Sequence, residues 1–597
     1  MIEKPQIAVI DFGGQYAHLI SKRLRHLGSY TTILPPDVDE SQLSGLKGLV
    51  LSGGPASVTD VDAPKWNPAI LQQPVPILGL CYGHHLIALA LGGKVGKAGQ
   101  GEYGIAYLDV IKDSPIFKGF AKKEPVWMSH GDSVLESPPG CQVIGSTPDC
   151  PVAAIASLDR PLFSVQFHPE VKDTPCGNQL LDNFLTICGA ERGWSMSRFR
   201  QLALEDMRKQ VGSRKVLIFL SGGVDSSVAY ALLVQALGRQ CVLGLYIDNG
   251  FMRYKETQQV KAIYDALGWQ VKFIDASDEF LAATHKICDP QEKRAIIGQQ
   301  FIDTRNRICQ ELNLNPEEWL LGQGTLYPDI IESGGTQHAD TIKTHHNRIR
   351  GIEELIDRGW VVEPLKDLYK DEVRALGEEL GLPESIVWRH PFPGPGLAIN
   401  VLCQPEKIPS NIPEISTEIK TFCKQRGYDA WILPVRSVGV QGDHRTYTSP
   451  LAVRGLRNWE KLEALSTAVT NTFRDINRVV LLLSEKDPSL GLHEGYLTRD
   501  RIDVVRHADF IMTQALTRYG LMRKVFQHLT IALPLGPTGH ESIVLRPVFS
   551  EDVMTARFAT LPWELVQEVT DQILQHPPIT DLYYDITHKP PATFGWE

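Results

Sequence analysis

The strongest constraint on the fold is a regular alternation of short apolar runs with longer amphipathic segments. In the first 190 residues the apolar runs are QIAVIDF, GLVLSGGP, VPILGL, AAIAS and LFSVQFHPE. Further along the chain, KVLIFL, CVLGLYIDNG and VKFIDA repeat the pattern. Strands that alternate with helices in this way are typical of βαβ units. We therefore predict the α/β class with mostly parallel sheets.

The length requires more than one hydrophobic core. The chain has 597 residues, whereas single cores stop growing at about 250–300 residues. A polar helical stretch at 195–213 and the proline-rich segment RHPFPGPGL at 389–397 mark candidate boundaries. We predict three domains, over residues 1–195, 196–396 and 397–597.

The third domain contains an internal repeat. WEKLEALSTAVTNTFRDINRVVLLL begins at Trp459, and WELVQEVTDQILQHPPITDLYYDI begins at Trp563. SPLAVRG and SIVLRPV precede the two helices at corresponding places. A duplicated α+β subdomain explains the pattern, with copies at about 425–485 and 530–597. A chance likeness of two amphipathic helices is the alternative.

The composition excludes several classes of protein. No apolar run approaches the roughly 20 residues that span a bilayer, and the start MIEKPQIAVIDFGGQY lacks the layout of a signal peptide. The 10 cysteines form no CxxC pair and show no Cys/His metal spacing. A net charge of −10 disfavours extended nucleic-acid binding. We expect a cytosolic protein in a reducing compartment, without structural zinc and with no membrane or nucleic-acid partner.

The stretch PILGLCYGHHLIALALGG, residues 76–93, places a cysteine at a tight turn. PILGL is typical of the end of a buried strand, and the residues after Cys81 are apolar at helical spacing until Gly92-Gly93. Cys81 would then lie at a helix N-terminus, where the helix dipole favours a thiolate. A small buried cysteine that fills a corner is the alternative.

Two other segments supply partners for this cysteine. The strand in FSVQFHPE ends at His168, and Glu170 follows after a proline. A cysteine, a histidine and a carboxylate make a nucleophile, a base and a group that orients the base. The loop Ser52-Gly53-Gly54-Pro55 follows another strand and offers backbone N–H groups for an oxyanion. For His168 taken alone, a structural role is the alternative.

Together these segments resemble the class I glutamine amidotransferases, whose nucleophile turn reads G-x-C-x-G. The resemblance covers nearly all of residues 5–190. It implies that Cys81 attacks the glutamine amide, His168 shuttles the proton, Glu170 orients His168, and ammonia leaves. The residues that it assigns to the oxyanion and glutamine site are Gly53, Gly54, Tyr82 and His85.

One of these positions departs from the family. His85 stands where the family usually has a glutamine that helps to hold the substrate. Imidazole can replace one of the amide hydrogen bonds but not both. We expect glutamine use to survive, with weaker binding.

A second Gly-rich turn follows the strand KVLIFL. SGGVDSS lies between this strand and a predicted helix N-terminus, where N–H groups point at an anion. The turn lacks the lysine of a Walker loop, and a generic Gly-rich turn is the alternative. It resembles the pyrophosphate loop of N-type ATP pyrophosphatases, which transfer AMP to an oxygen. The loop residues are Ser221, Gly222, Gly223, Val224, Asp225, Ser226 and Ser227.

This second resemblance implies a parallel-sheet domain of the adenine-nucleotide α-hydrolase-like (PP-loop) type. It also implies ATP with Mg²⁺, a hard cation that prefers oxygen ligands and phosphates. Asp225 is the expected metal ligand, and the strand end Tyr246–Gly250 would meet the adenosine.

Motifs along essentially the whole chain resemble the glutamine-hydrolysing GMP synthases. They include DPQEKRAIIGQQF, GQGTLYPDIIES, IKTHHN, RHPFPGPGL and ITHKPPATFGWE. An ammonia-producing domain joined to an AMP-transferring domain implies that an oxygen is adenylated and then displaced by nitrogen. In this family the acceptor is xanthosine 5′-monophosphate (XMP), which becomes GMP in the last step of de novo guanine nucleotide synthesis.

Position by position, the resemblance assigns three XMP contacts. Arg294 and Lys589 are cations suited to a phosphate dianion, and Asp443 would also meet the nucleotide. A solvated helix arginine and a tail lysine are the alternatives. Gly595 replaces the first Glu of the usual ending EWE, which helps to bind the nucleotide in the family. Lys343 is assigned to a lid over ATP.

Three questions remain open at this point. Many family members carry one C-terminal subdomain and pair through it, so two copies would build that pairing within one chain. We expect a monomer with an internal pseudo-dimer, or a weak homodimer. An NAD synthetase is one alternative function, against which HKPPAT and PFPGPGL count. A nucleotide sensor with degraded catalysis is the other, against which the intact catalytic residues count.

Overall fold

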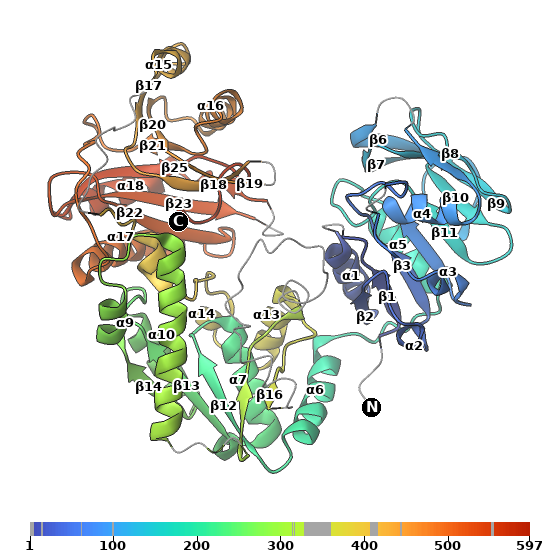
Figure 1. The fold of residues 1–597 in the computed structure, drawn as a ribbon, viewed down its shortest axis with the longest axis horizontal. Coiled ribbons are helices and arrows are strands. Elements are labelled where there is room, and N and C mark those ends of the chain that lie inside the picture. The colour runs from blue at the N-terminus through green and yellow to red at the C-terminus, as the bar shows by residue number, and fades with distance from the viewer. Residues whose placement is uncertain are drawn as a thin grey trace. The chain divides into compact units, whose positions relative to one another are not determined.

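The computed structural model describes most of the chain (Figure 1). The described residues are 5–13, 16–60, 63–97, 101–312, 315, 317–327, 360–405, 416–441, 444–550 and 555–597. Two compact units divide the chain. Unit 1 is Met1–Gln210, Gly324–Glu353 and Glu363–Glu379, and unit 2 is Val211–Gln323, Glu354–Val362 and Leu380–Glu597. The three domain boundaries taken from the sequence stay predictions, because a division by packing does not test them.

Unit 1 is built around a nine-stranded sheet with the order β2-β1-β3-β4-β11-β10-β9-β6-β7. The strands are β1 (Ile7–Ile10), β2 (Thr31–Leu34), β3 (Gly48–Leu51), β4 (Ile77–Leu80), β6 (Glu102–Val110), β7 (Lys123–His130), β9 (Cys141–Ser146), β10 (Ala154–Ser157) and β11 (Leu162–Val165). The five strands from β2 to β11 are parallel, as predicted. The other four are antiparallel. For them the predicted βα alternation was wrong, because no α-helix lies between β6 and β11, a stretch of the chain that the structure describes in full.

Helices cover both faces of this sheet, with α1 (Ala17–His26) and α5 (Gly177–Ile187) on one face and α2 (Glu40–Leu43), α3 (Ala69–Gln72) and α4 (Tyr82–Ala90) on the other. Two further helices, α6 (Met196–Val211) and α13 (Lys370–Glu379), lie outside this layer. Because successive strand residues point to opposite faces, Ile7 and Val9 pack with α1 and α5, whereas Ala8 and Ile10 pack with α4. A small two-stranded antiparallel sheet of β5 (Lys94–Gly96) and β8 (Ser133–Glu136) completes the unit.

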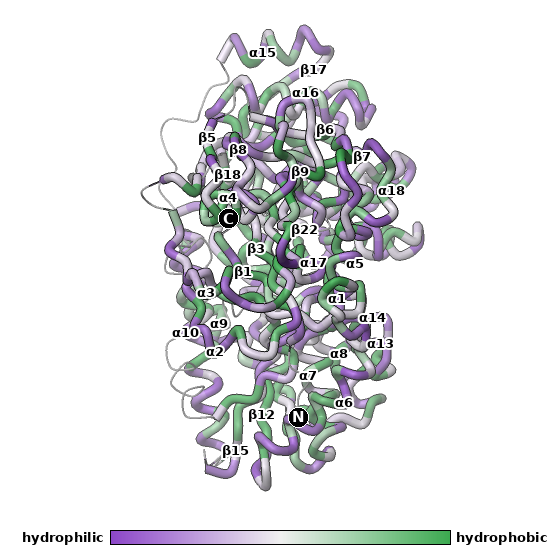
Figure 2. The backbone as a smooth tube through the Cα atoms, turned by 90° about the vertical axis from the view of Figure 1, so that its right-hand side faces the viewer, coloured by the Kyte–Doolittle hydropathy of each residue, from purple (hydrophilic) through white to green (hydrophobic). Residues whose placement is uncertain are grey.

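Unit 2 begins with a five-stranded, fully parallel sheet of order β14-β13-β12-β15-β16. The strands are β12 (Lys215–Leu220), β13 (Val242–Asp248), β14 (Val271–Asp275), β15 (Trp319–Gly322) and β16 (Val361–Val362). In Figure 2 the tube is green along β12, which is a buried central strand. The strand order reverses between β12 and β15, and ligands bind at the carboxyl ends of strands at such a point.

The helices of unit 2 connect and cover its sheets. They are α7 (Val224–Leu237), α8 (Glu256–Ala266), α9 (Ser277–Ala283), α10 (Pro290–Glu311), α14 (Glu384–Val387), α15 (Thr417–Lys424), α16 (Trp459–Thr472), α17 (Arg499–Arg518) and α18 (Trp563–Leu574). No helix in the described part of the chain is long and apolar enough to cross a membrane.

A second sheet of unit 2 has the order β17-β20-β21-β25-β23-β22, with β24 paired to β23. Its strands are β17 (Tyr428–Ile432), β20 (Leu451–Gly455), β21 (Val479–Leu482), β22 (Gln527–Leu533), β23 (Glu541–Phe549), β24 (Arg557–Phe558) and β25 (Ile579–Asp585), and a separate hairpin holds β18 (Ser437–Gln441) and β19 (His444–Thr448).

The order of this sheet agrees with the predicted duplication. In each half an outer strand pairs antiparallel with the strand before the helix, and that strand pairs parallel with the strand after it. The halves meet through the antiparallel pair β21 and β25. Trp459 and Trp563, which begin the two repeated helices, stack with their ring centroids 4.0 Å apart. The two copies therefore share one continuous sheet.

Candidate active sites

Cys81 occupies the sharp turn between β4 and α4. Its backbone φ is 50°, in a region that residues with side chains rarely adopt. The flanking glycines permit the turn. A Cβ on Gly79 would lie 2.6 Å from the Gly83 carbonyl oxygen, and a Cβ on Gly83 would lie 2.4 Å from the Leu51 carbonyl oxygen. The Cys81 amide donates to the Val165 carbonyl (3.0 Å), so the turn is tied to β11.

His168 follows β11 and is buried beside this cysteine. Its Nδ1 lies 2.7 Å from Glu170 Oε1. Burial by itself lowers the pKa of His168, but the Glu170 carboxylate and a hydrogen bond with Cys81 raise this pKa to about 10. The structure thus brings the three predicted catalytic residues together.

The predicted oxyanion loop lies against the same pair. A Cβ on Gly53 would lie 3.3 Å from His168 Cε1 and 3.7 Å from Cys81 Cβ. Gly54 packs closely on Phe12, since its Cβ would lie 2.8 Å from the Phe12 carbonyl oxygen. Tyr82 is buried, with its ring centroid 5.1 Å from that of Phe12. The loop is therefore placed to meet an amide at Cys81, whereas the contact between Tyr82 and glutamine stays a prediction.

His85 belongs to a chain of hydrogen bonds that ends at the nucleophile. Its Nε2 lies 2.7 Å from Gln166 Oε1, and Gln166 Nε2 donates to Cys81 Sγ at 3.9 Å. Because an amide oxygen only accepts, His85 Nε2 carries the proton. Burial lowers the pKa of His85 to about 4, so the ring is neutral at pH 7. His85 orients the Gln166 amide toward the sulfur.

Gln166 is a residue that the sequence analysis missed. It directly follows β11 (Leu162–Val165) and lies in the bend that leads to His168. Its place beside the predicted base was the available signal. The use of that signal required knowing that Cys81 packs against this bend.

The loop Ser221–Ser227 lies between β12 and α7, as predicted. Gly222 has a backbone φ of +74°. The hydroxyls of Ser221 and Ser226 form a hydrogen bond, with their Oγ atoms 3.3 Å apart. Ser227 Oγ donates to the Gly223 carbonyl at 2.8 Å. Asp225 lies in the first turn of α7. N–H groups at a helix N-terminus make an anion site, so the loop suits a polyphosphate.

Arg389 supports this loop from the RHPFPGPGL segment, a role that the sequence analysis missed. Its Nη1 donates to the Gly222 carbonyl at 2.7 Å, and its Nη2 donates to the Glu256 carboxylate. A Cβ on Gly222 would lie 2.6 Å from Arg389 Nη1. The contact requires both a glycine and a cation at this point. The segment predicted as a rigid crossing between domains therefore also shapes the loop.

Two of the predicted XMP contacts lie near the end of the chain. Arg294 Nη2 donates to the Glu597 main-chain oxygen at 2.6 Å. The neighbouring Lys293 is fully buried and lies 3.0 and 2.9 Å from the Glu597 carboxylate oxygens. Lys589 Nζ lies 4.5 Å from the ring centroid of Phe594. The sequence analysis missed the pair of Lys293 and Glu597.

The remaining predicted residues are Gly595, Asp443, Lys343 and those of the strand end Tyr246–Gly250. A Cβ on Gly595 would meet only the Glu597 main-chain oxygen, at 3.8 Å, so this position has room for a side chain. Asp443 and Lys343 lie outside the described residues. At the strand end assigned to adenosine, the Thr257 hydroxyl donates to Asp248 Oδ2 at 2.6 Å.

Family models match three parts of the chain. Glutamine amidotransferase class-I matches residues 8–188, NAD synthase matches 197–326, and the GMP synthase C terminal domain matches 423–490 and 514–596. A probable GMP synthase (glutamine-hydrolyzing) of Leptospira interrogans is 42% identical over 608 residues, which cover 100% of both chains. This chain belongs to the glutamine-hydrolysing GMP synthase family.

Other members of the GMP synthase family match at similar levels. The enzyme of Dictyostelium discoideum is 35% identical over 98% of this chain and 94% of its own. That of Limosilactobacillus reuteri is 40% identical over 81% of this chain and 97% of its own. A solved structure from Thermoplasma acidophilum, described as one subunit of a putative GMP synthase, is 35% identical, with a TM-score of 0.28, and covers 31% of this chain and 95% of that chain.

Membership of the GMP synthase family confirms the fold class predicted from the sequence. It also decides against the NAD synthetase alternative. The NAD synthase model matches only the segment that contains the pyrophosphate loop, whereas the GMP synthase relatives match along the full length.

Proposed function

We propose that this chain is a ligase that aminates XMP to GMP, with ATP as activator and glutamine as the source of ammonia. The observation that supports the proposal is the presence of two sets of predicted reactive residues on one chain. Unit 1 holds the ordered set of Cys81, His168 and Glu170, and unit 2 holds the loop Ser221–Ser227. One set suits amide hydrolysis and the other suits transfer of AMP.

In the first reaction, the Cys81 thiolate attacks the carboxamide carbon of glutamine. Backbone N–H groups of the Gly53 loop stabilise the oxyanion that develops. His168 gives its proton to the leaving ammonia, and Glu170 holds the imidazole in place. His168 then removes a proton from water, which hydrolyses the thioester to glutamate and restores the thiolate.

In the second reaction, the loop Ser221–Ser227 holds the ATP phosphates. The xanthine C2 oxygen attacks the α-phosphorus, and pyrophosphate leaves. Ammonia then adds at C2. The bond between C2 and the adenylated oxygen breaks, and AMP leaves with that oxygen and the electron pair of the bond. Arg294, Asp443 and Lys589 are proposed to hold XMP, and Lys343 to cover ATP.

Mg²⁺ is proposed to accompany ATP at this loop. The donor set there consists of serine hydroxyl and Asp225 carboxylate oxygens, which fit a hard cation and not a soft one. The ion would neutralise phosphate charge, and Asp225 is the residue that would hold it.

We further propose that the chain acts in the cytosol as a monomer with an internal pseudo-dimer, or as a weak homodimer. All ten cysteines are free, which suits a reducing compartment. The continuous sheet made by the two C-terminal copies supports pairing within one chain.

GMP formation from XMP, ATP and Mg²⁺ tests the function, with glutamine or ammonium chloride as the nitrogen source. Product with both sources is expected. Cys81→Ala is expected to abolish glutamine-dependent synthesis and to spare ammonia-dependent synthesis, because the sulfur serves only the first reaction. Equal loss of both would contradict the division between the sites. The absence of product with either source would favour a nucleotide sensor.

A further inference from the structure

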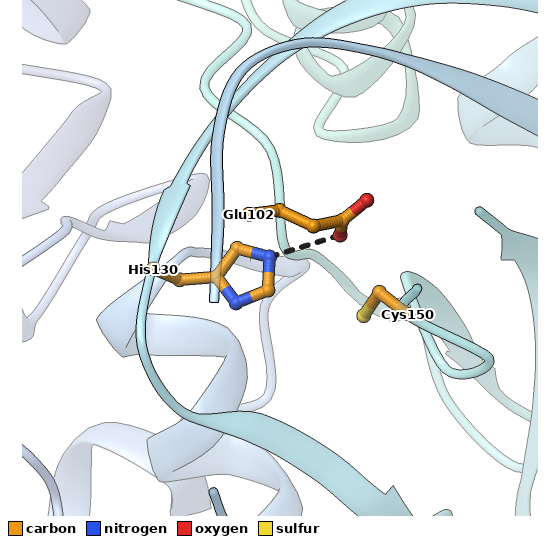
Figure 3. Close-up of side chains that lie close together, drawn as sticks. All are labelled: Glu102, His130 and Cys150. Carbon is orange, nitrogen blue, oxygen red and sulfur yellow. Dashed lines mark hydrogen bonds and ion pairs between the residues drawn. The ribbon is translucent and has the colours of Figure 1, made fainter. Parts of the chain in front are cut away.

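Three side chains of different chemistry converge in unit 1, and the reaction proposed above uses none of them. Glu102 on β6, His130 at the end of β7 and Cys150 in the turn after β9 each offer one ligand atom, and these atoms lie within 4.8 Å of one another. Figure 3 shows the imidazole beside the carboxylate, with the sulfur turned toward both. His130 and Cys150 are buried. Carboxylate, imidazole and thiolate are the ligands that zinc uses in proteins.

The imidazole of His130 is oriented like that of a metal ligand. Its Nδ1 lies 2.8 Å from the Asp132 carbonyl oxygen, so Nδ1 carries a proton. Its Nε2 lies 3.1 Å from Glu102 Oε2. A nitrogen lone pair that faces a carboxylate oxygen is repelled unless a cation lies between them, either a proton or a metal ion. Histidines that bind metals commonly have the other ring N–H fixed by a carbonyl in this way.

Thr147 holds the other two donors. Its hydroxyl donates to Glu102 Oε1 (2.8 Å) and accepts from the Cys150 amide (2.9 Å). The Thr147 amide donates to the Cys150 carbonyl (2.9 Å). These bonds fix the carboxylate and the cysteine relative to each other. A metal ion would replace the contact of Glu102 Oε2 with His130 Nε2 and the hydrogen bonds of the Cys150 thiol with Ser133 and the Val152 backbone. A tetrahedral zinc ion keeps its ligand atoms about 3.3–3.8 Å apart. The distances between the three ligand atoms would therefore have to shorten by about 1 Å at most for all three to bind one ion.

We propose that Glu102, His130 and Cys150 bind one Zn²⁺ ion. Binding replaces two protons, one from the thiol and one shared by Glu102 and His130, and both protons pass to water. The +2 charge of the ion is then balanced by one thiolate and one carboxylate, with a neutral imidazole as third ligand. A water molecule would take the fourth position.

The proposed zinc site lies next to the glutaminase residues. The carbonyl oxygen of Ser129, which directly precedes His130 on β7, lies 3.8 Å from Cys81 Sγ. The ion would therefore brace the end of the strand that faces the nucleophile. The sequence did not indicate this site, because its three donors come from separate segments without a metal-binding spacing.

The test is metal binding by the full-length chain with Cys81→Ala, which removes the competing pair of Cys81 and His168. After treatment with a chelator, this protein is expected to bind one equivalent of Zn²⁺. Its Co²⁺ form is expected to show thiolate-to-cobalt charge transfer and the visible bands of tetrahedral cobalt. Adding Cys150→Ala should abolish the charge transfer and weaken zinc binding roughly 100-fold.

Two further variants complete the experiment. Cys141→Ala removes a half-buried cysteine outside the cluster, and it should leave both signals unchanged. If Cys150→Ala does not fold, as judged by circular dichroism and thermal unfolding, Glu102→Gln serves instead and should weaken zinc binding about 10-fold. Binding that is absent, or that neither variant weakens, would overturn the proposal and leave Glu102 and His130 as a proton-bridged pair.

Discussion

Glu170→Gln should slow glutamine hydrolysis by about 100-fold at pH 8. The carboxylate of Glu170 holds the pKa of His168 near 10, against the opposing effect of burial. The difference between 10 and the ordinary value of 6.5 is worth about 5 kcal/mol. The substituted amide still accepts the hydrogen bond from Nδ1, so we expect a loss of about half this energy, on the order of 2–3 kcal/mol, which corresponds to about 100-fold in rate.

The raised pKa of His168 also predicts how glutaminase activity depends on pH. A raised pKa means that the His168 imidazolium persists at neutral and mildly alkaline pH and is lost as the pH rises through about 10. Glutaminase activity of the unmodified chain should therefore hold up to about pH 10 and then fall. In Glu170→Gln the contribution of the carboxylate is lost and Cys81 alone opposes burial, so the same decline should occur at a lower pH.

The assay is glutamate release between pH 6 and pH 10, with ammonia-dependent GMP synthesis as an internal check on unit 2. Asp173→Asn is the matched control, because it neutralises an exposed carboxylate in the same segment. It should leave the rate and the pH profile unchanged. An unaltered pH profile in Glu170→Gln would refute the argument that Glu170 sets the charge state of His168.

Two further predictions concern unit 2. Arg389→Ala removes the donor to the Gly222 carbonyl and leaves the buried Glu256 carboxylate without its arginine partner, so the KM for ATP in ammonia-dependent synthesis should rise about 10-fold or more. Arg523→Ala, at an exposed ion pair, is the control, and an unchanged KM in Arg389→Ala would contradict the role. Trp459→Ala removes the ring stacked on Trp563 and should destabilise the C-terminal sheet by about 3 kcal/mol. Urea unfolding measures this, and a loss below about 1 kcal/mol would show that the stack is not central to the sheet.

Much of each site could be predicted from local sequence, because its chemistry depends on turns made by neighbouring residues. The turn at Cys81 needs a glycine on either side, since a Cβ at Gly79 or Gly83 would meet main-chain oxygens. The loop Ser221–Ser227 likewise carries its own helix N-terminus and its own hydroxyl pairs. Short-range constraints of this kind leave a readable pattern of glycines, serines and apolar runs.

Contacts between distant segments could not be predicted in this way. Gln166 reaches Cys81, and Arg389 reaches Gly222, only because separate elements pack together. The antiparallel half of the first sheet was missed for a related reason. A short apolar run such as AAIAS looks the same in parallel and antiparallel strands, and the register of pairing is decided by the neighbours.

The sequence by itself determined the α/β class, the two Gly-rich turns on which the predicted reactive residues lie, and the repeat in the C-terminal part of the chain. Only the tertiary structure decided which polar side chains meet. It placed Gln166 between His85 and the nucleophile, joined the two C-terminal copies into one sheet, and gathered Glu102, His130 and Cys150. The physical reason is the distance along the chain over which each interaction acts. Backbone conformation depends on adjacent residues, whereas hydrogen bonds and ligand sets depend on how distant elements pack.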